Sequence, residues 1–214
     1  MKRSMFTIFA AMALTVATGA ALADDDDRDH DRNPVLTFRL LPHPKFVNCL
    51  KAPNGPTPTA DVAVVRGKQN DTLVLRLKNI RPDLAFDMFT VQNTTLRSDG
   101  TVDPAFSNFG MAWYQSDVQA DHRGGAEVQI KTILLDQIFG FDAATGLPPT
   151  NTFHVGIWFN DPKDAAACGF DVTKPTPFNG DHKAGPVAMI SVTDPQKGVG
   201  PLCTKPGPNG SCNP

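Results

Sequence analysis

TFHVGIWFNDPKDAAACG, residues Thr152 to Gly169, decides the fold class more clearly than any other stretch of the sequence. From position 153 to 160 apolar residues alternate with others, so that every second side chain lies on one face of an extended chain. The apolar face carries Phe153, Val155, Ile157 and Phe159, and the opposite face carries His154, Gly156, Trp158 and Asn160. This pattern predicts a half-buried β-strand.

A short helix is predicted directly after this strand. Asp161 can cap its N-terminus, Pro162 suits the first helical position, and Asp164 places negative charge near the positive end of the helix dipole. Three alanines follow, and Gly169 can adopt the left-handed conformation that ends a helix. We expect a helix over residues 162–168 that ends at Cys168.

Short alternating segments separated by Gly, Pro, Asn and Asp recur along the rest of the chain. They lie at 35–41, 61–65, 72–77, 87–92, 110–115, 126–135 and 187–192, with loops expected at 48–59 and 140–149. We therefore predict an all-β fold of about nine strands, an antiparallel β-sandwich of the Ig-like, cupredoxin-like or jelly-roll kind, or a barrel. A single domain is expected over residues 34–194.

The N-terminal residues have the features of a secretory signal. Lys2 and Arg3 precede an apolar segment, and Ala21-Leu22-Ala23 forms an A-x-A cleavage site. We expect a signal peptide at 1–23, a disordered acidic tail at 24–33, and a Pro/Gly-rich tail at 195–214. The apolar segment is too short for a stable membrane anchor, so we expect a protein that is periplasmic or extracellular.

The charge balance excludes two classes of partner. The formal net charge is -2, and Lys and Arg do not cluster in the sequence. Nucleic acids and anionic membranes attract strongly basic surfaces, so we expect neither as a partner.

Four cysteines in an exported chain predict two disulfides, since an oxidising compartment favours pairing and no C-x-x-C spacing occurs. Three connectivities are possible. Because Cys203 and Cys212 are near neighbours in a tail without a core of its own, we pair them with each other. Cys49 is then left to pair with Cys168.

Parts of the sequence resemble known families. The G-x-x-x-D-T-L-x-L-x-L-x-N pattern within Val64 to Asn79 is similar to the opening strand pair of cupredoxins, and FNGDHKAGPV, residues 178–187, resembles loops of copper-zinc superoxide dismutases. The run from Leu135 to Ile190 is similar to uncharacterised secreted bacterial proteins.

The sequence does not supply the full set of metal ligands that either of these two metalloprotein families uses. A cupredoxin places its Cys, His and Met ligands close together, whereas Cys168, His182 and Met189 are far apart in this sequence. We therefore expect no cofactor. The alternative is a copper or zinc site, in a metal-binding or oxidoreductase domain, formed by His122, His154 and His182.

No complete catalytic motif is present. The sequence has no Gly-x-Ser-x-Gly elbow, no phosphate-binding loop and no dinucleotide fingerprint, and Glu127 is its only glutamate. We expect a non-enzymatic protein.

One aromatic strand face is the candidate binding site. His154 and Trp158 flank Gly156 on the predicted strand, and Trp113-Tyr114 lies on another. An aromatic platform flanked by aspartates can hold a sugar ring or anchor a protein partner, so we predict binding of a glycan or another exported protein at these residues. The alternative is that Trp158 belongs to a second core layer.

Overall fold

The structure is a computed structural model that describes residues 36–136, 140–142, 147–150, 153–180, 183–207 and 212. The predicted signal peptide at 1–23 and the acidic tail at 24–33 lie outside the described residues, as does His182. No helix in the described part of the chain is both long and apolar enough to span a membrane.

The described residues contain ten antiparallel strands, and eight of them make one sheet in the order β5-β4-β9-β10-β1-β2-β3-β6. These eight are β1 (Leu36–Pro42), β2 (Thr59–Val65), β3 (Asp71–Lys78), β4 (Ala85–Val91), β5 (Ala112–Gln119), β6 (Ala126–Thr132), β9 (His154–Phe159) and β10 (Val187–Ile190). The predicted all-β antiparallel fold is thus confirmed.

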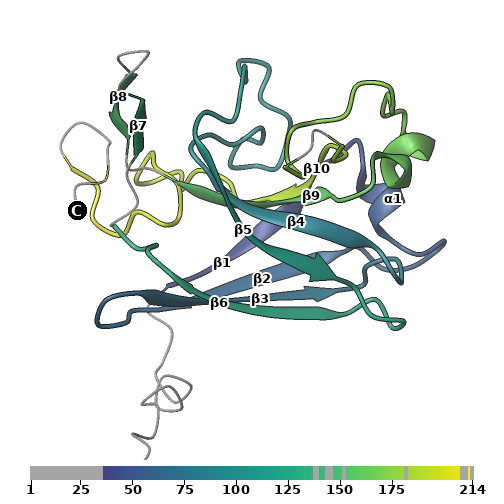
Figure 1. Ribbon diagram of the computed structural model, residues 1–214, viewed down its shortest axis with the longest axis horizontal. Helices are drawn as coiled ribbons and strands as arrows, with labels where there is room; N and C mark the ends of the chain where they lie inside the picture. Colours follow the sequence, from purple (N-terminus) through teal and green to yellow (C-terminus); the bar gives the residue numbers. More distant parts are fainter. Residues whose placement is uncertain are drawn as a thin grey trace, which may run out of the picture.

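The long sheet folds back on itself into two layers (Figure 1). Strand β1 belongs to both layers, since Leu36 to Leu40 pair with β2 while Leu41 and Pro42 pair with β10. The two edge strands of this sheet, β5 and β6, contact each other, so that the sheet is nearly closed and barrel-like.

The main core fills the space between the two layers. In β3 the alternation predicted from the sequence holds, because Leu73, Leu75 and Leu77 are buried while Arg76 and Lys78 are exposed. Large side chains from the opposite layer belong to the same core, among them Phe86 of β4, Phe159 of β9 and Phe153, which directly precedes β9. Burial of this apolar surface is the principal stabilising contribution to the fold.

Strand β9 differs from the prediction in one respect: it is buried on both faces, and not half-buried. Its outer face is covered by a second apolar cluster to which the connections around Phe109 and Phe178 contribute. We call this cluster the second core layer; its buried members are Phe89, Val91, Leu96, Trp158, Phe178, Ala184, Val187 and Ile190.

Two elements occupy segments that were predicted to be loops. A ribbon of β7 (Gly140–Asp142) and β8 (Leu147–Thr150) lies apart from the main sheet, where the prolines of β8 are tolerated because the strand has only one neighbour. The one-turn helix α1 (Val47–Leu50) has no side-chain cap, so the signal by which a helix start is recognised is missing.

The predicted helix at 162–168 is present as the 3-10 helix η2 (Pro162–Cys168). Asp161 accepts a hydrogen bond from the Lys163 amide at 2.8 Å, and Gly169 ends the helix with φ of 80°. Cys168 at the helix end forms the predicted disulfide with Cys49 of α1, from which it is 119 positions away in sequence. This bond ties η2 to the segment that follows β1.

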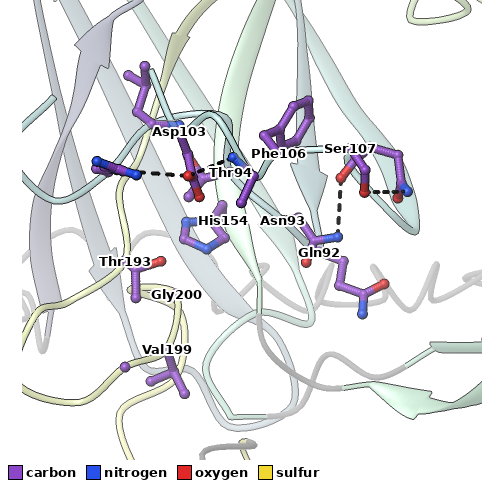
Figure 2. A pocket seen from close by; sticks show the side chains of 15 residues that line it. Gln92, Asn93, Thr94, Asp103, Phe106, Ser107, His154, Thr193, Val199 and Gly200 are labelled. Atoms are coloured by element: carbon purple, nitrogen blue, oxygen red, sulfur yellow. Dashed lines mark hydrogen bonds and ion pairs between the residues drawn. The ribbon is translucent and has the colours of Figure 1, made fainter. Parts of the chain in front are cut away.

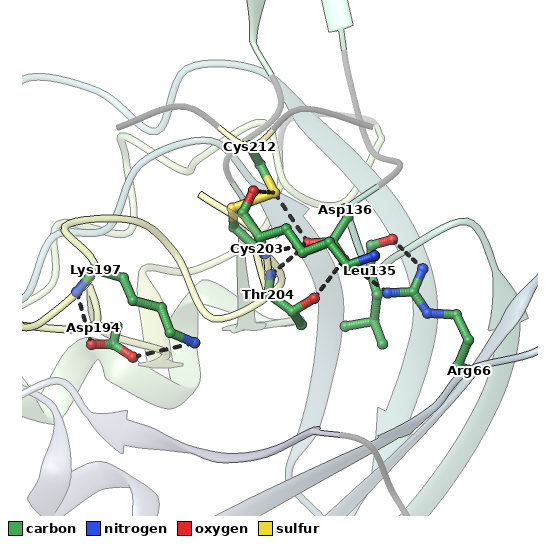
Figure 3. The surroundings of a disulfide bond; sticks show 9 residues. Arg66, Leu135, Asp136, Asp194, Lys197, Cys203, Thr204 and Cys212 are labelled. Atoms are coloured by element: carbon green, nitrogen blue, oxygen red, sulfur yellow. Dashed lines mark hydrogen bonds and ion pairs between the residues drawn. A yellow bond between two sulfur atoms is a disulfide. The ribbon is translucent and has the colours of Figure 1, made fainter. Parts of the chain in front are cut away.

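The second predicted disulfide, Cys203–Cys212, is also present, and a buried carboxylate holds it against the barrel (Figure 3). Asp136 accepts hydrogen bonds from the backbone amides of Thr204 and Lys205, from the Thr204 hydroxyl and from Arg66. Its own amide donates to the carbonyl of Leu202. The C-terminal segment is therefore fixed by a carboxylate as well as by its disulfide.

Candidate functional site

The structure separates the four residues that the sequence grouped into one binding face. Trp158 is fully buried and stacks on Phe178, with ring centroids 4.2 Å apart and an interplanar angle of 8°. Phe89 and Phe109 contact the indole edge-on. Of the two interpretations of Trp158, the structure thus places it in a second core layer.

The indole of Trp158 covers Gly156 on the outer face of β9. A Cβ added to Gly156 would lie 2.8 Å from Cζ3 of Trp158, so the ring packs directly over the strand backbone. Gly156 allows this close approach because it has no side chain. The prediction that Trp158 offers a solvent-facing platform is wrong, since the segments that carry Phe109 and Phe178 cover it.

Trp113 and Tyr114 also differ from the prediction, because they point to opposite faces of β5. Trp113 is half-buried and packs edge-on against Phe153 of the main core, with ring centroids 5.0 Å apart. Tyr114 lies on the outer face, 53% exposed, with its ring 5.5 Å from that of Phe89. Of the predicted aromatic residues, Tyr114 is the most exposed to solvent.

The alternative three-histidine metal site is not formed. His154 pairs with Val91, which pairs with Ala112, whereas His122 lies in the exposed turn beyond the other end of β5. At about 3.3 Å per strand residue this places the two histidines roughly 20 Å apart, too far to share an ion. His182, the third proposed ligand, lies outside the described residues.

Within the described residues, one group of potential metal ligands converges, namely Asp136, Cys203 and Cys212. Both cysteines are joined in a disulfide, so neither offers a thiolate. Cys168, the copper ligand that a cupredoxin would need, is likewise disulfide-bonded.

A pocket of about 580 Å³ lies beside the Tyr114 ring, between β4, β5, β9 and the segment after η2. We call it the Tyr114 pocket; it is lined by Asp87, Phe89, Tyr114, Asp117, Asn160, Pro177, Asn179 and Gly180. Its walls combine an aromatic ring with carboxylates and carboxamides.

Two carboxylates face each other across the strands of this pocket. Asp87 and Asp117 are direct cross-strand partners in β4 and β5, and Asp87 is buried. The Asn160 amide donates to Asp87 Oδ1 at 3.0 Å, and the Asn179 amide donates to the Asn160 carbonyl. Asn160 and Asn179 therefore hold the pocket floor in place while Asp117 remains at its rim.

The hydroxyl of Tyr114 remains protonated over the whole physiological range. Partial burial raises the pKa of Tyr114 to about 12, and a hydrogen bond to Asp117 and the charges of Asp117 and Asp87 act in the same direction. The phenol oxygen can accept a hydrogen bond from a ligand, and the ring offers a flat apolar surface.

The polar residues that line this pocket were not predicted from the sequence. Asp87 lies within the strand AFDMFTV, where one carboxylate among apolar residues is the signal that could have identified it. Asn160 and Asn179 gave no comparable signal, because their approach depends on the path of the connection between η2 and β10.

His154 lines a second, separate hollow of about 370 Å³ (Figure 2). Its walls come from the connection between β4 and β5 and from the segment after β10. We call it the His154 hollow; its lining residues are Gln92, Asn93, Thr94, Leu96, Arg97, Asp103, Ala105, Phe106, Ser107, Asn108, His154, Thr193, Gly198, Val199 and Gly200.

The imidazole of His154 is almost completely buried. Its Nδ1 lies 3.2 Å from the hydroxyl oxygen of Ser191, which also accepts a hydrogen bond from the Val155 amide. Burial lowers the pKa of His154 to about 4, although the backbone of Ser191 acts in the opposite direction. The ring is therefore neutral at pH 7.

No known protein family matches this chain, and no curated protein sequence matches it.

Proposed function

We propose that this protein is an exported, non-enzymatic glycan-binding protein and that the Tyr114 pocket holds one sugar ring. The observation that carries the proposal is the exposed Tyr114 ring, which forms one wall of a pocket that also contains Asp87, Asp117 and Asn160. Pockets of this size, with an apolar wall and a few placed polar groups, are typical of small-ligand sites.

Each group in the pocket has a role that sugar chemistry would use. The Tyr114 ring can pack against the C–H face of a pyranose, and its hydroxyl oxygen can accept a hydrogen bond. Asp117 accepts hydrogen bonds from sugar hydroxyls, while the asparagine side chains can both donate and accept. This arrangement suits an uncharged, polyhydroxylated ring.

Export is supported by the disulfides together with the N-terminal sequence. Two disulfides are typical of the periplasm or the extracellular space, where the environment is oxidising. The predicted signal peptide at 1–23 would direct the chain to such a compartment.

A glycan array probed with the wild-type protein tests this function. We expect binding to a restricted set of glycans, reduced at least tenfold in Tyr114→Ala, which corresponds to about 1.4 kcal/mol. Tyr114→Phe keeps the ring and should retain most of the affinity. Ile133→Ala is the matched control, because Ile133 is 50% exposed but does not line the pocket.

Two outcomes would contradict the proposal. One is an array without any glycan that distinguishes the wild type from Tyr114→Ala. The other is release of shorter sugars from a bound glycan, measured by mass spectrometry, which would show that the aspartates of the pocket catalyse hydrolysis.

A further inference from the structure

The His154 hollow contains a buried side chain with one unused hydrogen-bonding group. His154 is 3% exposed, and its ring lies at the middle of the side chains that surround the hollow in Figure 2. Nδ1 is occupied by Ser191, whereas Nε2 has no hydrogen-bond partner within the part of the chain that the structure describes. A ring nitrogen beside a cavity is thus left for a ligand.

Ser191 holds the inner edge of the imidazole. Its hydroxyl oxygen lies 3.2 Å from Nδ1 and also accepts a hydrogen bond from the Val155 amide. A neutral imidazole has one N–H donor and one bare nitrogen acceptor, so Nε2 can form a hydrogen bond with a ligand in the hollow in either tautomer.

The charged groups of the hollow neutralise each other. Arg97 forms an ion pair with Asp103 at 3.5 Å, and the remaining polar lining groups are hydroxyls and carboxamides. Because His154 is neutral as well, no unpaired charge is available to compensate a charged ligand in the hollow. The lining favours an uncharged ligand with hydrogen-bonding oxygen atoms.

The walls of the hollow are held in place by the surrounding fold. A Cβ added to Gly200 would lie 2.3 Å from the Phe153 carbonyl oxygen and 3.1 Å from Cδ2 of His154, so only glycine lets this wall approach so closely. On the other side, the Thr94 hydroxyl donates to the Ser191 carbonyl, and the Asn93 amide donates to the Asn108 carbonyl. The hollow is thus preformed, which lowers the entropic cost of binding.

From this geometry we propose that the His154 hollow is a second binding site, which takes an uncharged polar molecule through a hydrogen bond between Nε2 of His154 and a polar group of the ligand. The site is independent of the Tyr114 pocket, with which it shares no lining residue. Its ligand needs a polar group that hydrogen-bonds to an imidazole nitrogen, such as a hydroxyl or an amide, and no formal charge.

Two small probes of equal shape and different charge test the site. The 15N-labelled full-length protein is titrated at pH 7 with acetamide and, separately, with sodium acetate at constant ionic strength, and the imidazole nitrogens of His154 are followed by NMR. We expect acetamide to produce a saturable shift of Nε2 and of the Gly200 amide. Acetate should produce at least tenfold weaker effects.

Variants identify the group responsible. His154→Asn can retain a partner for Ser191 but has no group at the Nε2 position, so the Gly200 response to acetamide should weaken at least tenfold. Thr193→Val removes a lining hydroxyl without altering the core, and should weaken the response several-fold even if His154→Asn fails to fold. Tyr114→Ala should leave the response unchanged, which separates this site from the proposed glycan site.

The proposal is overturned if acetate binds as tightly as acetamide, or if neither probe shifts His154 or Gly200. It is also overturned if Thr193→Val and a folded His154→Asn both retain the wild-type response.

Discussion

Trp113 and Tyr114 are neighbours in β5, but their rings lie on opposite faces of the sheet, one against Phe153 in the core and the other beside a pocket that is open to solvent. Alternation along a strand has this effect on every pair of adjacent residues. A Trp-Tyr pair that resembles a continuous aromatic surface in the sequence thus supplies only one exposed ring. Tyr114 is therefore the aromatic residue on which the proposed function depends.

Replacement of Trp158 should affect stability far more than replacement of Tyr114. Trp158 is fully buried between aromatic rings, so Trp158→Ala leaves a large cavity and should lower the free energy of unfolding by about 3–5 kcal/mol. Tyr114→Ala should lower it by no more than about 1 kcal/mol, because the ring is half exposed. Urea denaturation measures both values, and equal losses would show that Trp158 is not a core residue.

The two disulfides should contribute unequally to stability. They join residues 119 and 9 positions apart, for which the chain-entropy estimate is about 5 and about 3 kcal/mol. Cys49→Ser/Cys168→Ser should therefore lower the urea midpoint more than Cys203→Ser/Cys212→Ser. The double replacements avoid an unpaired thiol, and the opposite order of midpoints would contradict the prediction.

Stability should decrease on acidification because of His154. Its pKa is about 4 in the folded protein and near 6.5 when exposed, so the unfolded chain binds more protons between these values. The contribution of neutral His154 to the free energy of unfolding is fully present above pH 6.5. About 3 kcal/mol of it is lost as the pH falls from 6.5 to 4. His154→Gln does not titrate, so its free energy of unfolding should depend less on pH in this window. Parallel curves for the two proteins would contradict the prediction.

Asp136→Asn should loosen the C-terminal segment. Burial by itself would raise the pKa of Asp136, but hydrogen bonds from Thr204, Arg66 and Lys205 outweigh it and hold the pKa below its usual value. The stabilisation is therefore present at neutral pH and is lost as the pH falls through this lowered pKa.

The expected loss in Asp136→Asn is about 1–3 kcal/mol, because the amide accepts fewer hydrogen bonds and meets Arg66 without a charge. Hydrogen exchange should become faster at Thr204 and Lys205, and remain unchanged in β3. Uniform acceleration across the barrel would instead indicate global destabilisation.

Much of the fold follows from local patterns in the sequence. Alternation predicted the strands, Asp161 and Gly169 predicted η2, and the proximity of Cys203 and Cys212 led to the correct disulfide pairing. These predictions were correct because each depends on residues that are near in sequence or on pairing by elimination.

The site was less predictable because it depends on contacts between distant segments. Whether Trp158 faces solvent is decided by Phe109 and Phe178, which no pattern within β9 specifies. The position of Asp87 opposite Asp117 likewise depends on the register of β4 and β5. Alternation indicates that two faces differ, but not what covers each of them.

Mapping the contact surface of the best glycan from the array tests the central claim most directly. Backbone amide shifts of the 15N-labelled protein are followed as this glycan is added. The account predicts that the saturable shifts centre on Tyr114, Asp117, Asn160 and Asn179, and that Tyr114→Ala abolishes them. Shifts centred instead on the charged outer face of β2 and β3, around Asp61 and Arg76, and unchanged in Tyr114→Ala, would contradict it.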